Sequence, residues 1–437
     1  MKEFLVYSEK LTNRLTYTTR FIFQECMDLK LVVTDNLNFY RTSNLPRICY
    51  HSQRIASGIH IPDSGFLNET GIRRDAAIVL RTNKYPVLFP VKTDADFSFD
   101  LFAAVFFMIS RYEEYYVLPP DSYGRFDPAL SLAGQHDFLQ TPVVDLWIRD
   151  LAELLKDRFP NLQVETGKFT FIPTIDIDNA WAYRHKGFLR TAGSMLRALT
   201  TGRHNELIER MKVLNGEEQD PYDTYDTIIS LHKQLPTPLV FFILFARYWQ
   251  FDRGINPANR YFIELIRRMH LHGKIGIHPS VRSADDRHVF HSELIGLDEV
   301  LGERILWSRQ HYLRISLPAT YENLIKAGIN RDFSMGYASA PGFRAGTSRS
   351  FLFYNLAREE ETTLRVVPFQ VMDRTLKDYL GLGHQDSKDV IRDLIASVKS
   401  VNGTFCSIWH NESFSDKGEW KGWTDVYKQM LLMIQNQ

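Results

Sequence analysis

Cysteine is scarce in this chain, with only Cys26, Cys49 and Cys406 among 437 residues. The three are far apart, odd in number, and form no Cys-x-x-Cys pair. The sequence therefore argues against a disulfide framework or a zinc site built from thiolates, and we expect three buried free thiols.

An excess of charge of one sign is also missing, because 52 lysine and arginine residues balance 52 aspartate and glutamate residues. A chain with no net charge has no overall field to concentrate nucleic acid or an anionic membrane, so neither is an expected partner. Long apolar runs are missing as well. The longest, 101–109 and 239–246, are far shorter than the roughly 20 residues that span a bilayer.

The start of the chain has no segment long enough for a secretory signal. Only the short run 4–7 is apolar after the charged pair at 2–3, and a signal peptide needs roughly 7 to 15 such residues. We therefore expect a cytoplasmic location and no membrane insertion.

Several widespread catalytic motifs are absent too. The sequence contains no G-x-S-x-G, no H-E-x-x-H, no G-x-x-x-x-G-K-[ST] and no G-x-G-x-x-G. Serine hydrolases with a nucleophile elbow, zincin proteases, P-loop nucleotide hydrolases and dinucleotide-binding enzymes all lose support.

The chain does have the composition of a large globular protein, with 44% hydrophobic and 24% charged residues. A helical apolar pattern at 145–155 is broken by Phe159-Pro160-Asn161, and a new strand begins after Lys168. This break predicts a domain boundary. We expect a smaller α/β domain at residues 1–160 and a second domain at 168–437.

The first domain is expected to contain strands near 4–7, 29–34 and 77–80 and a buried helix over about 99–114. A loop at 118–127 follows, with aromatic and charged side chains. This loop could contact a ligand, although packing between domains is the commoner role of such a segment.

Strand-like runs in the second domain end in polar residues. The run 169–175 leads into Asp176-Ile177-Asp178, 274–277 into His278, and 404–409 into His410. Further runs lie at 239–245, 312–316, 334–337 and 364–369, with helices between them such as 259–269. Because the carboxyl ends of barrel strands meet on one face, the pattern predicts an α/β fold, a distorted (β/α)7-type barrel, with these polar residues in one site.

Asp176 and Asp178 are two residues apart, so both project to the same face of an extended strand. A metal ligand beside a general base is one use of such a pair, because a cation relieves their repulsion. A turn or helix cap at Asp178-Asn179 is the alternative. His278, fixed by the following Pro279, is either a metal ligand or a structural histidine, and His410 is either a general acid or structural.

Two further segments carry candidates. Arg344 lies between Gly342 and Gly346 and could hold a carboxylate or close a loop through a salt bridge. His311 and Arg314 would face opposite sides of the strand expected at 312–316, which slightly favours structural roles. Trp181 follows the aspartates, where an aromatic ring could stack on a sugar.

In their order, these motifs resemble those of the polysaccharide deacetylase family, the NodB-like carbohydrate esterases, over roughly residues 168–437. The stretch 174–178 is similar to the first motif, whose leading aspartate is the catalytic base and whose second aspartate binds a metal. The stretch 272–278 is similar to the approach to the first metal histidine, and Trp409-His410 is similar to the last motif, which supplies the general acid.

The resemblance implies a divalent metal ion, with zinc expected, held by Asp178 and His278. The second metal histidine of the family falls on Arg282, so the site lacks one ligand. His311 is the candidate third ligand, and a ligand from the N-terminal domain or a site without metal are the alternatives. The arginine motif that lines the groove corresponds to the segment of either Arg314 or Arg344.

Two further site assignments come from the same resemblance. Asp373 is the candidate to orient His410. The candidate substrate-binding residues are Trp181, because of its aromatic ring, and Arg314 and Trp409, from the resemblance.

The implied activity is deacetylation of an N- or O-acetylated sugar or polysaccharide precursor, with Asp176 as base and His410 as acid. Two alternatives remain open. In one, the barrel has lost catalysis, as Arg282 suggests, and binds a glycan or a protein partner. In the other, Asp176 and His410 hydrolyse C–N bonds without a metal. One role open to the N-terminal domain is to cover the groove and restrict the substrate.

Overall fold

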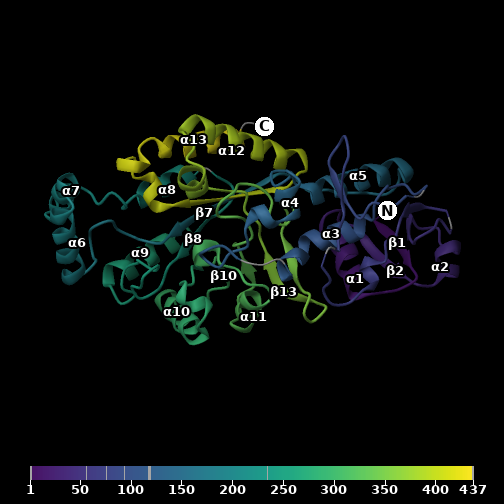
Figure 1. Cartoon of the computed structure of the whole chain (residues 1–437), viewed down its shortest axis with the longest axis horizontal. Helices are drawn as coiled ribbons and strands as arrows, with labels where there is room; N and C mark the ends of the chain where they lie inside the picture. Colours follow the sequence, from purple (N-terminus) through teal and green to yellow (C-terminus); the bar gives the residue numbers. More distant parts are fainter. Residues whose placement is uncertain are drawn as a thin grey trace.

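The computed structural model describes residues 2–55, 57–74, 76–92, 94–116, 120–233 and 235–435. Figure 1 shows an elongated molecule with a small N-terminal sheet at one end, a barrel in the middle, and the helices α6 (Phe188–Thr200) and α7 (His204–Leu214) at the other end. Within the described residues, no helix is long and apolar enough to cross a membrane.

The N-terminal sheet has four parallel strands in the order β2-β1-β3-β4. They are β2 (Lys30–Thr34), β1 (Glu3–Ser8), β3 (Arg47–Tyr50) and β4 (Ile59–Ile61). Phe4 and Val6 of β1 pack into the main core, while Leu5 and Tyr7 belong to a separate apolar cluster. The sheet is therefore covered on both faces, as parallel sheets require.

The helices of this part are α1 (Asn13–Thr19), α2 (Leu37–Thr42), α3 (Leu101–Ile109), α4 (Leu132–Gln135) and α5 (Val143–Arg158), and α3 is buried on all sides as predicted. The expected helix over 99–114 is shorter than predicted, because Arg111 has φ 53° and the chain continues as a 3-10 turn at Tyr112–Tyr115. The strand expected near 77–80 is β5 (Val79–Arg81), which pairs with β6 (Pro86–Leu88).

The barrel is a nine-stranded sheet in the order β12-β13-β11-β10-β9-β8-β7-β15-β14, parallel throughout except for β12. Its strands are β7 (Thr170–Ile177), β8 (Leu239–Ile243), β9 (Gly273–Ile277), β10 (Trp307–Ser308), β11 (Arg331–Asp332), β12 (Phe351–Asn355), β13 (Glu360–Val366), β14 (Val371–Met372) and β15 (Thr404–His410). The helices around them are α8 (Tyr225–His232), α9 (Arg260–His270), α10 (Arg287–Leu301), α11 (Ala319–Lys326), α12 (His384–Ser400) and α13 (Trp423–Gln435). The predicted α/β class and distorted barrel are confirmed.

The barrel strands separate two cores by the alternation of their side chains. Phe241 and Ile243 of β8 pack outward into the main core, whereas Val240 and Phe242 belong to a second cluster that fills the interior. In β7, Ile175 and Ile177 pack into the main core. The residues of opposite parity in β7, which lead to the two aspartates, therefore point inward.

Three predicted strands are wrong or misplaced. The segment 312–316 is not a strand, because His311–Leu313 form a tight turn with Tyr312 at φ 58°. The paired strand there is the two-residue β10. The segment 334–337 is a loop that follows β11, and the run 364–369 extends beyond the end of β13 at Val366. Leu313, Val367 and Phe369 lie beyond the strand ends and belong to the interior cluster, whereas Ile315 and Met335 belong to the main core.

The segment 159–169, between α5 and β7, contains neither helix nor strand. The parts on its two sides share direct contacts. Arg14 pairs with Glu359, and the Tyr17 hydroxyl donates to the Leu352 carbonyl at 2.6 Å. Helix α1 of the N-terminal part therefore packs against the β12–β13 edge of the barrel.

Candidate metal centre and active site

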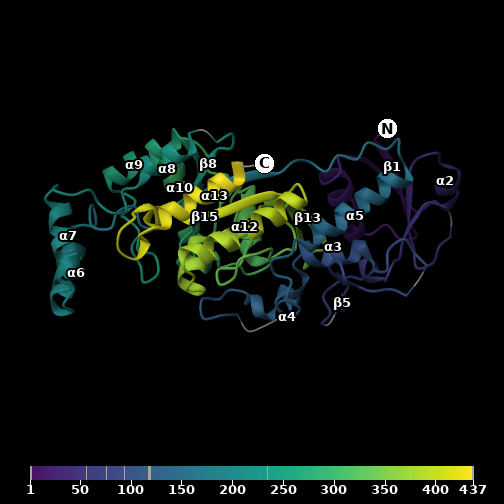
Figure 2. The same ribbon diagram turned by 90° about the horizontal axis from the view of Figure 1, so that it is seen from above.

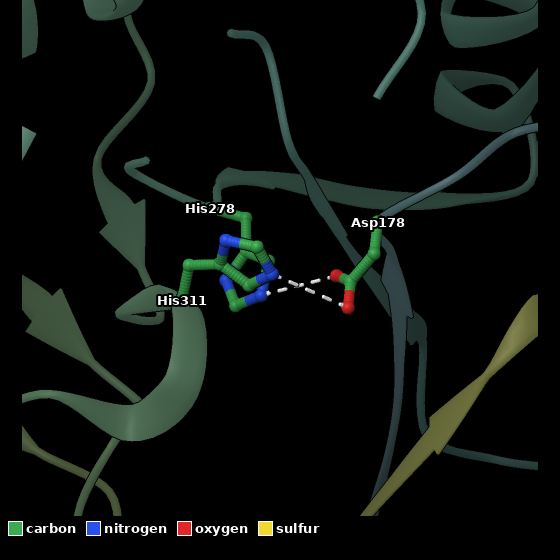
Figure 3. Close-up of side chains that lie close together, drawn as sticks. All are labelled: Asp178, His278 and His311. Carbon is green, nitrogen blue, oxygen red and sulfur yellow. Dashed lines mark ion pairs between the residues drawn. The ribbon is translucent and has the colours of Figure 1, made fainter. Parts of the chain in front are cut away.

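Three side chains from different strand ends of the barrel converge in Figure 3: Asp178 after β7, His278 after β9 and His311 after β10. His278 Nε2 lies 3.2 Å from Asp178 Oδ1, and His311 Nε2 lies 3.5 Å from Asp178 Oδ2. One atom from each residue lies within 4.8 Å of the others. Two imidazoles and a carboxylate in this arrangement are a typical ligand set for zinc with an open position.

Both histidines are held so that Nε2 faces Asp178. His278 Nδ1 is 2.5 Å from the Arg309 carbonyl oxygen, and His311 Nδ1 is 2.8 Å from Asp252 Oδ1. Outer partners of this kind fix the tautomer and direction of metal-binding histidines. Asp178 Oδ1 is buried, and no described group donates a well-aligned hydrogen bond to it, although His278 Nε2 lies 3.2 Å away. A carboxylate that faces two imidazoles in this way fits a divalent cation.

The electrostatics of the cluster point the same way. Burial alone would raise the pKa of Asp178, but the His311 charge and hydrogen bonds from His278 and His311 hold it well below its usual range. Burial opposes protonation of His311, yet Asp178 and then Asp252 raise the pKa of His311 to about 9. The carboxylates of Asp178 and Asp252 thus favour a positive charge at the imidazoles. A bound metal ion can supply that charge in place of a proton.

Asp176 lies beside this cluster and is held by an arginine. Its Oδ1 accepts a hydrogen bond from Arg309 Nη1 at 2.7 Å, and its Oδ2 is 3.8 Å from His278 Nε2. Arg309 is fully buried, donates also to the Thr174 hydroxyl at 2.7 Å, and stacks over the Phe242 ring. The carboxylate of Asp176 is therefore fixed beside the cluster.

Sequence reasoning missed Arg309. It stands two residues before His311, directly after β10, and a two-residue strand is too short to leave an alternating pattern. The signal that was available is the spacing of an arginine and a histidine within Arg309-Gln310-His311.

Arg314 and Arg344, the two arginines that the sequence suggests for the arginine motif of the groove, do not contact Asp176. Arg344 is buried and forms a two-bond pair with Glu114, with Nε 2.8 Å from Oε1 and Nη2 2.6 Å from Oε2. Arg314 pairs with Asp285 outside the site. The structure thus brings neither to Asp176, and Arg344 closes a contact between the N-terminal part and the barrel.

His410 faces Asp178 from the other side of the cluster, with Nε2 3.6 Å from Asp178 Oδ2. Its Nδ1 lies 2.8 Å from Asp373 Oδ1, and its backbone N–H donates to Asp373 Oδ2 at 2.8 Å. The Ser413 hydroxyl also donates to Asp373. Burial alone would lower the pKa of His410, but Asp373 raises it, so His410 holds a proton more firmly than a free imidazole.

These groups line a cavity of about 560 Å³ with aromatic walls. Tyr123, Phe251, Tyr312 and Tyr379 line it, and the Tyr123 and Tyr312 rings stack with centroids 5.3 Å apart. Tyr123 comes from the N-terminal part of the chain. The described residues of the predicted loop at 118–127 therefore reach the site, although residues 118–119 lie outside the described part.

The two tryptophans predicted to bind substrate do not line this cavity. Trp181 is 5% exposed and packs against the His185 ring, and Trp409 is fully buried against Tyr427. Trp409 has the opposite parity to His410 on β15, so it points outward into the main core. Its place is set by the pleat that aims His410 inward.

Arg282 lies away from the cluster. It is exposed, its guanidinium is 5.7 Å from the centre of the Trp249 ring, and it does not line the cavity. The third residue of the cluster is His311, which follows β10, the next strand of the barrel. The cluster therefore has three residues although position 282 is an arginine.

Comparison with known proteins gives a partial picture. Residues 4–160 match the model of a family of unknown function, DUF7033. No curated protein matches the sequence.

The fold is similar to solved structures at low identity. A proposed polysaccharide deacetylase from Mycobacterium smegmatis is 12% identical, covering 62% of this chain and 86% of its own, with a TM-score of 0.40. The PuuE allantoinase is 11% identical, covering 62% and 85%, with a TM-score of 0.39. The polysaccharide deacetylase Bc1974 from Bacillus cereus is 10% identical, covering 60% and 87%, with a TM-score of 0.28. The function proposed below depends on the geometry of the site itself.

Proposed function

We propose that this protein is a metal-dependent deacetylase acting on an N- or O-acetylated saccharide. The observation that carries the proposal is one cavity in which a carboxylate–histidine–histidine cluster lies between an anchored aspartate and an anchored histidine. Asp176 Oδ2 is 3.8 Å from His278 Nε2 on one side, and His410 Nε2 is 3.6 Å from Asp178 Oδ2 on the other. Hydrolysis of an acyl bond needs a base for water and an acid for the leaving group.

Each group of the chain then has a defined task. Asp178, His278 and His311 would hold a divalent metal ion, which would supply a Lewis acid for the acetyl carbonyl and for water. Asp176, fixed by Arg309, accepts the proton of the attacking water. His410 carries a proton that Asp373 stabilises, and it donates that proton to the departing sugar nitrogen or oxygen.

The aromatic walls support a carbohydrate as the substrate class. Tyr123, Phe251 and Tyr379 are 42%, 37% and 42% exposed, so their rings offer open faces in and around the cavity. Apolar faces of sugars pack on such rings. The position of Tyr123 supports the idea that the N-terminal part restricts which saccharide can enter.

The competing function, a barrel that binds glycan without catalysis, was favoured by Arg282. His311 lies beside Asp178 and His278, so the cluster has three candidate ligands without residue 282, and this supports an active site. A metal-independent C–N hydrolase would use the same Asp176 and His410, and only its insensitivity to chelators would distinguish it.

The test is release of acetate from N-acetylated chitooligosaccharides and from O-acetylated xylan, before and after treatment with a chelator. Asp176→Asn and His410→Gln should each lower kcat by about a thousandfold, while Arg282→Ala, an exposed change outside the cavity, should not. Activity that survives both the chelator and Asp176→Asn would contradict the proposed mechanism.

A further inference from the structure

A second, larger cavity of about 1400 Å³ adjoins the first, and Asn179 and Arg253 line both. It is formed by the segment after β7, the beginning of α6 and the segment after β8. Asp178, a ligand of the metal cluster, lies only eight residues before Lys186 of this second cavity. Figures 1 and 2 place α6 at the end of the molecule farthest from the N-terminal sheet.

The walls of this cavity are strongly basic. Of the described residues that line it, six are cationic and none is aspartate or glutamate; the six are Lys186, Arg190, Arg197, Arg210, Arg247 and Arg253. Among the residues that the structure describes, only Arg210 of these six forms an ion pair, with Glu206. The segment 180–205 holds five lysine and arginine residues without one acidic residue, in a chain whose net charge is zero. Such a wall attracts an anion.

Arg210 and Lys186 are only partly compensated by the groups around them. Arg210 is only 5% exposed, and its Nε has no hydrogen-bond partner. Burial, and then Arg190, lower the pKa of Lys186 to about 7, which shows how poorly its charge is compensated. The negative charge of Asp220 acts on Lys186, but both its oxygens already accept backbone N–H groups of residues 182–184.

The first turn of α6 adds unpaired backbone donors. Helix α6 begins after Gly187, and no side chain caps its N-terminus. Residues 187–190 line the cavity, so this positive end of the helix faces it. Guanidinium groups, an ammonium group and a free helix N-terminus together are the groups that bind phosphate in proteins.

Apolar side chains lie at the rim of the same cavity. Phe188 and Leu189 both line it and are 84% and 85% exposed. Leu196 and Leu199 of the same helix are 63% and 52% exposed. Exposed apolar residues beside uncompensated cations are typical of helices that lie at the surface of an anionic lipid layer.

We propose that the basic cavity binds the phosphate or diphosphate that joins the substrate saccharide to a lipid carrier, with the apolar residues of α6 against the lipid. This inference rests on the proposed function, because the saccharide would extend from the basic cavity past Asn179 into the catalytic one. A nucleotide would also supply phosphate. The lipid is favoured because Phe188 and Leu189 present apolar surface at the rim.

The phosphate site is tested by titrating inorganic pyrophosphate into the full chain by calorimetry. The double variant Arg197→Glu/Arg247→Glu changes two lining residues outside the catalytic cavity, and it should weaken binding by at least about tenfold. Arg287→Glu is the matched control, since Arg287 is exposed on α10 and lines neither cavity. No binding by the wild type, or equal weakening in the control, would overturn the inference.

The lipid part is tested by sedimentation with phosphatidylcholine vesicles, with and without phosphatidic acid. We expect binding only with phosphatidic acid, lost in Phe188→Ser/Leu189→Ser and kept in Leu271→Ser, whose side chain is 80% exposed on another element. Tight binding of a uridine diphosphate sugar without vesicle binding would overturn the lipid carrier. Both readouts are independent of hydrolysis, so a failure to release acetate would reject the proposed function without deciding this inference.

Discussion

Replacing Arg344 by methionine tests whether this arginine serves catalysis or holds two parts of the chain together. Its guanidinium and the Glu114 carboxylate are 2% and 4% exposed and share two hydrogen bonds. Removing one partner of a buried pair leaves an uncompensated charge and costs about 3–5 kcal/mol. Arg111 also pairs with Glu114, at 2.7 Å, so we expect a loss at the lower end, about 3 kcal/mol.

The same pair predicts how stability depends on pH. Burial alone would raise the pKa of Glu114, but Arg344 and Arg111 lower it to about 2, below the ordinary 4.5. The stabilisation is therefore complete above pH 4.5 and is lost as the pH falls towards 2. A difference of this size is worth about 3 kcal/mol, and Arg344→Met should remove much of this acid-dependent part.

Urea unfolding at pH 7 and at pH 3 measures both effects. Arg358→Met is a suitable control, because Arg358 is 55% exposed in its ion pair with Glu322, where a loss below about 1 kcal/mol is expected. The double variant Glu114→Leu/Arg344→Met should recover part of the stability. An unchanged free energy of unfolding together with a collapse of kcat would refute this reasoning and return Arg344 to a catalytic role.

Three further changes separate the tasks within the site, each measured by acetate release. Arg309→Gln should lower kcat by about a hundredfold with metal content unchanged, because Asp176 loses its anchor; an unaltered kcat would contradict that role. Asp373→Asn should lower kcat and shift the alkaline limb of the pH profile to lower pH, because the general acid must be protonated and Asp373 raises the pKa of His410; an unmoved alkaline limb would show that His410 is not the acid. Tyr123→Ala should raise KM more than it lowers kcat, and a purely catalytic defect would exclude stacking on the sugar.

The sequence was most informative where a strand ended in a chemically distinctive residue. The alternation of β7 placed Asp176 and Asp178 on one face, and the runs before His278 and His410 marked strands whose ends meet in the same barrel. Patterns that extend over several residues depend only on local geometry and on burial of alternate residues, so they can be recognised without knowing the fold.

The sequence was least informative where function depends on short or irregular segments. Arg309 and His311 follow the two-residue strand β10, which is too short to leave a pattern in the sequence. The apolar run at 312–316 therefore predicts a strand, whereas His311 lies in a tight turn. The contact of Tyr123 with the site depends on how two distant parts pack. The balanced total charge concealed the local excess of cations between 180 and 205.

The most direct test of the account is the amount of divalent metal per chain, measured by mass spectrometry on protein prepared without chelator or nickel affinity resin. The account predicts about one ion per wild-type chain, lost in His311→Ala and retained in Arg282→Ala. No bound metal in the wild type after addition of zinc and dialysis, or full retention by His311→Ala, would contradict the assignment of Asp178, His278 and His311 as a metal centre.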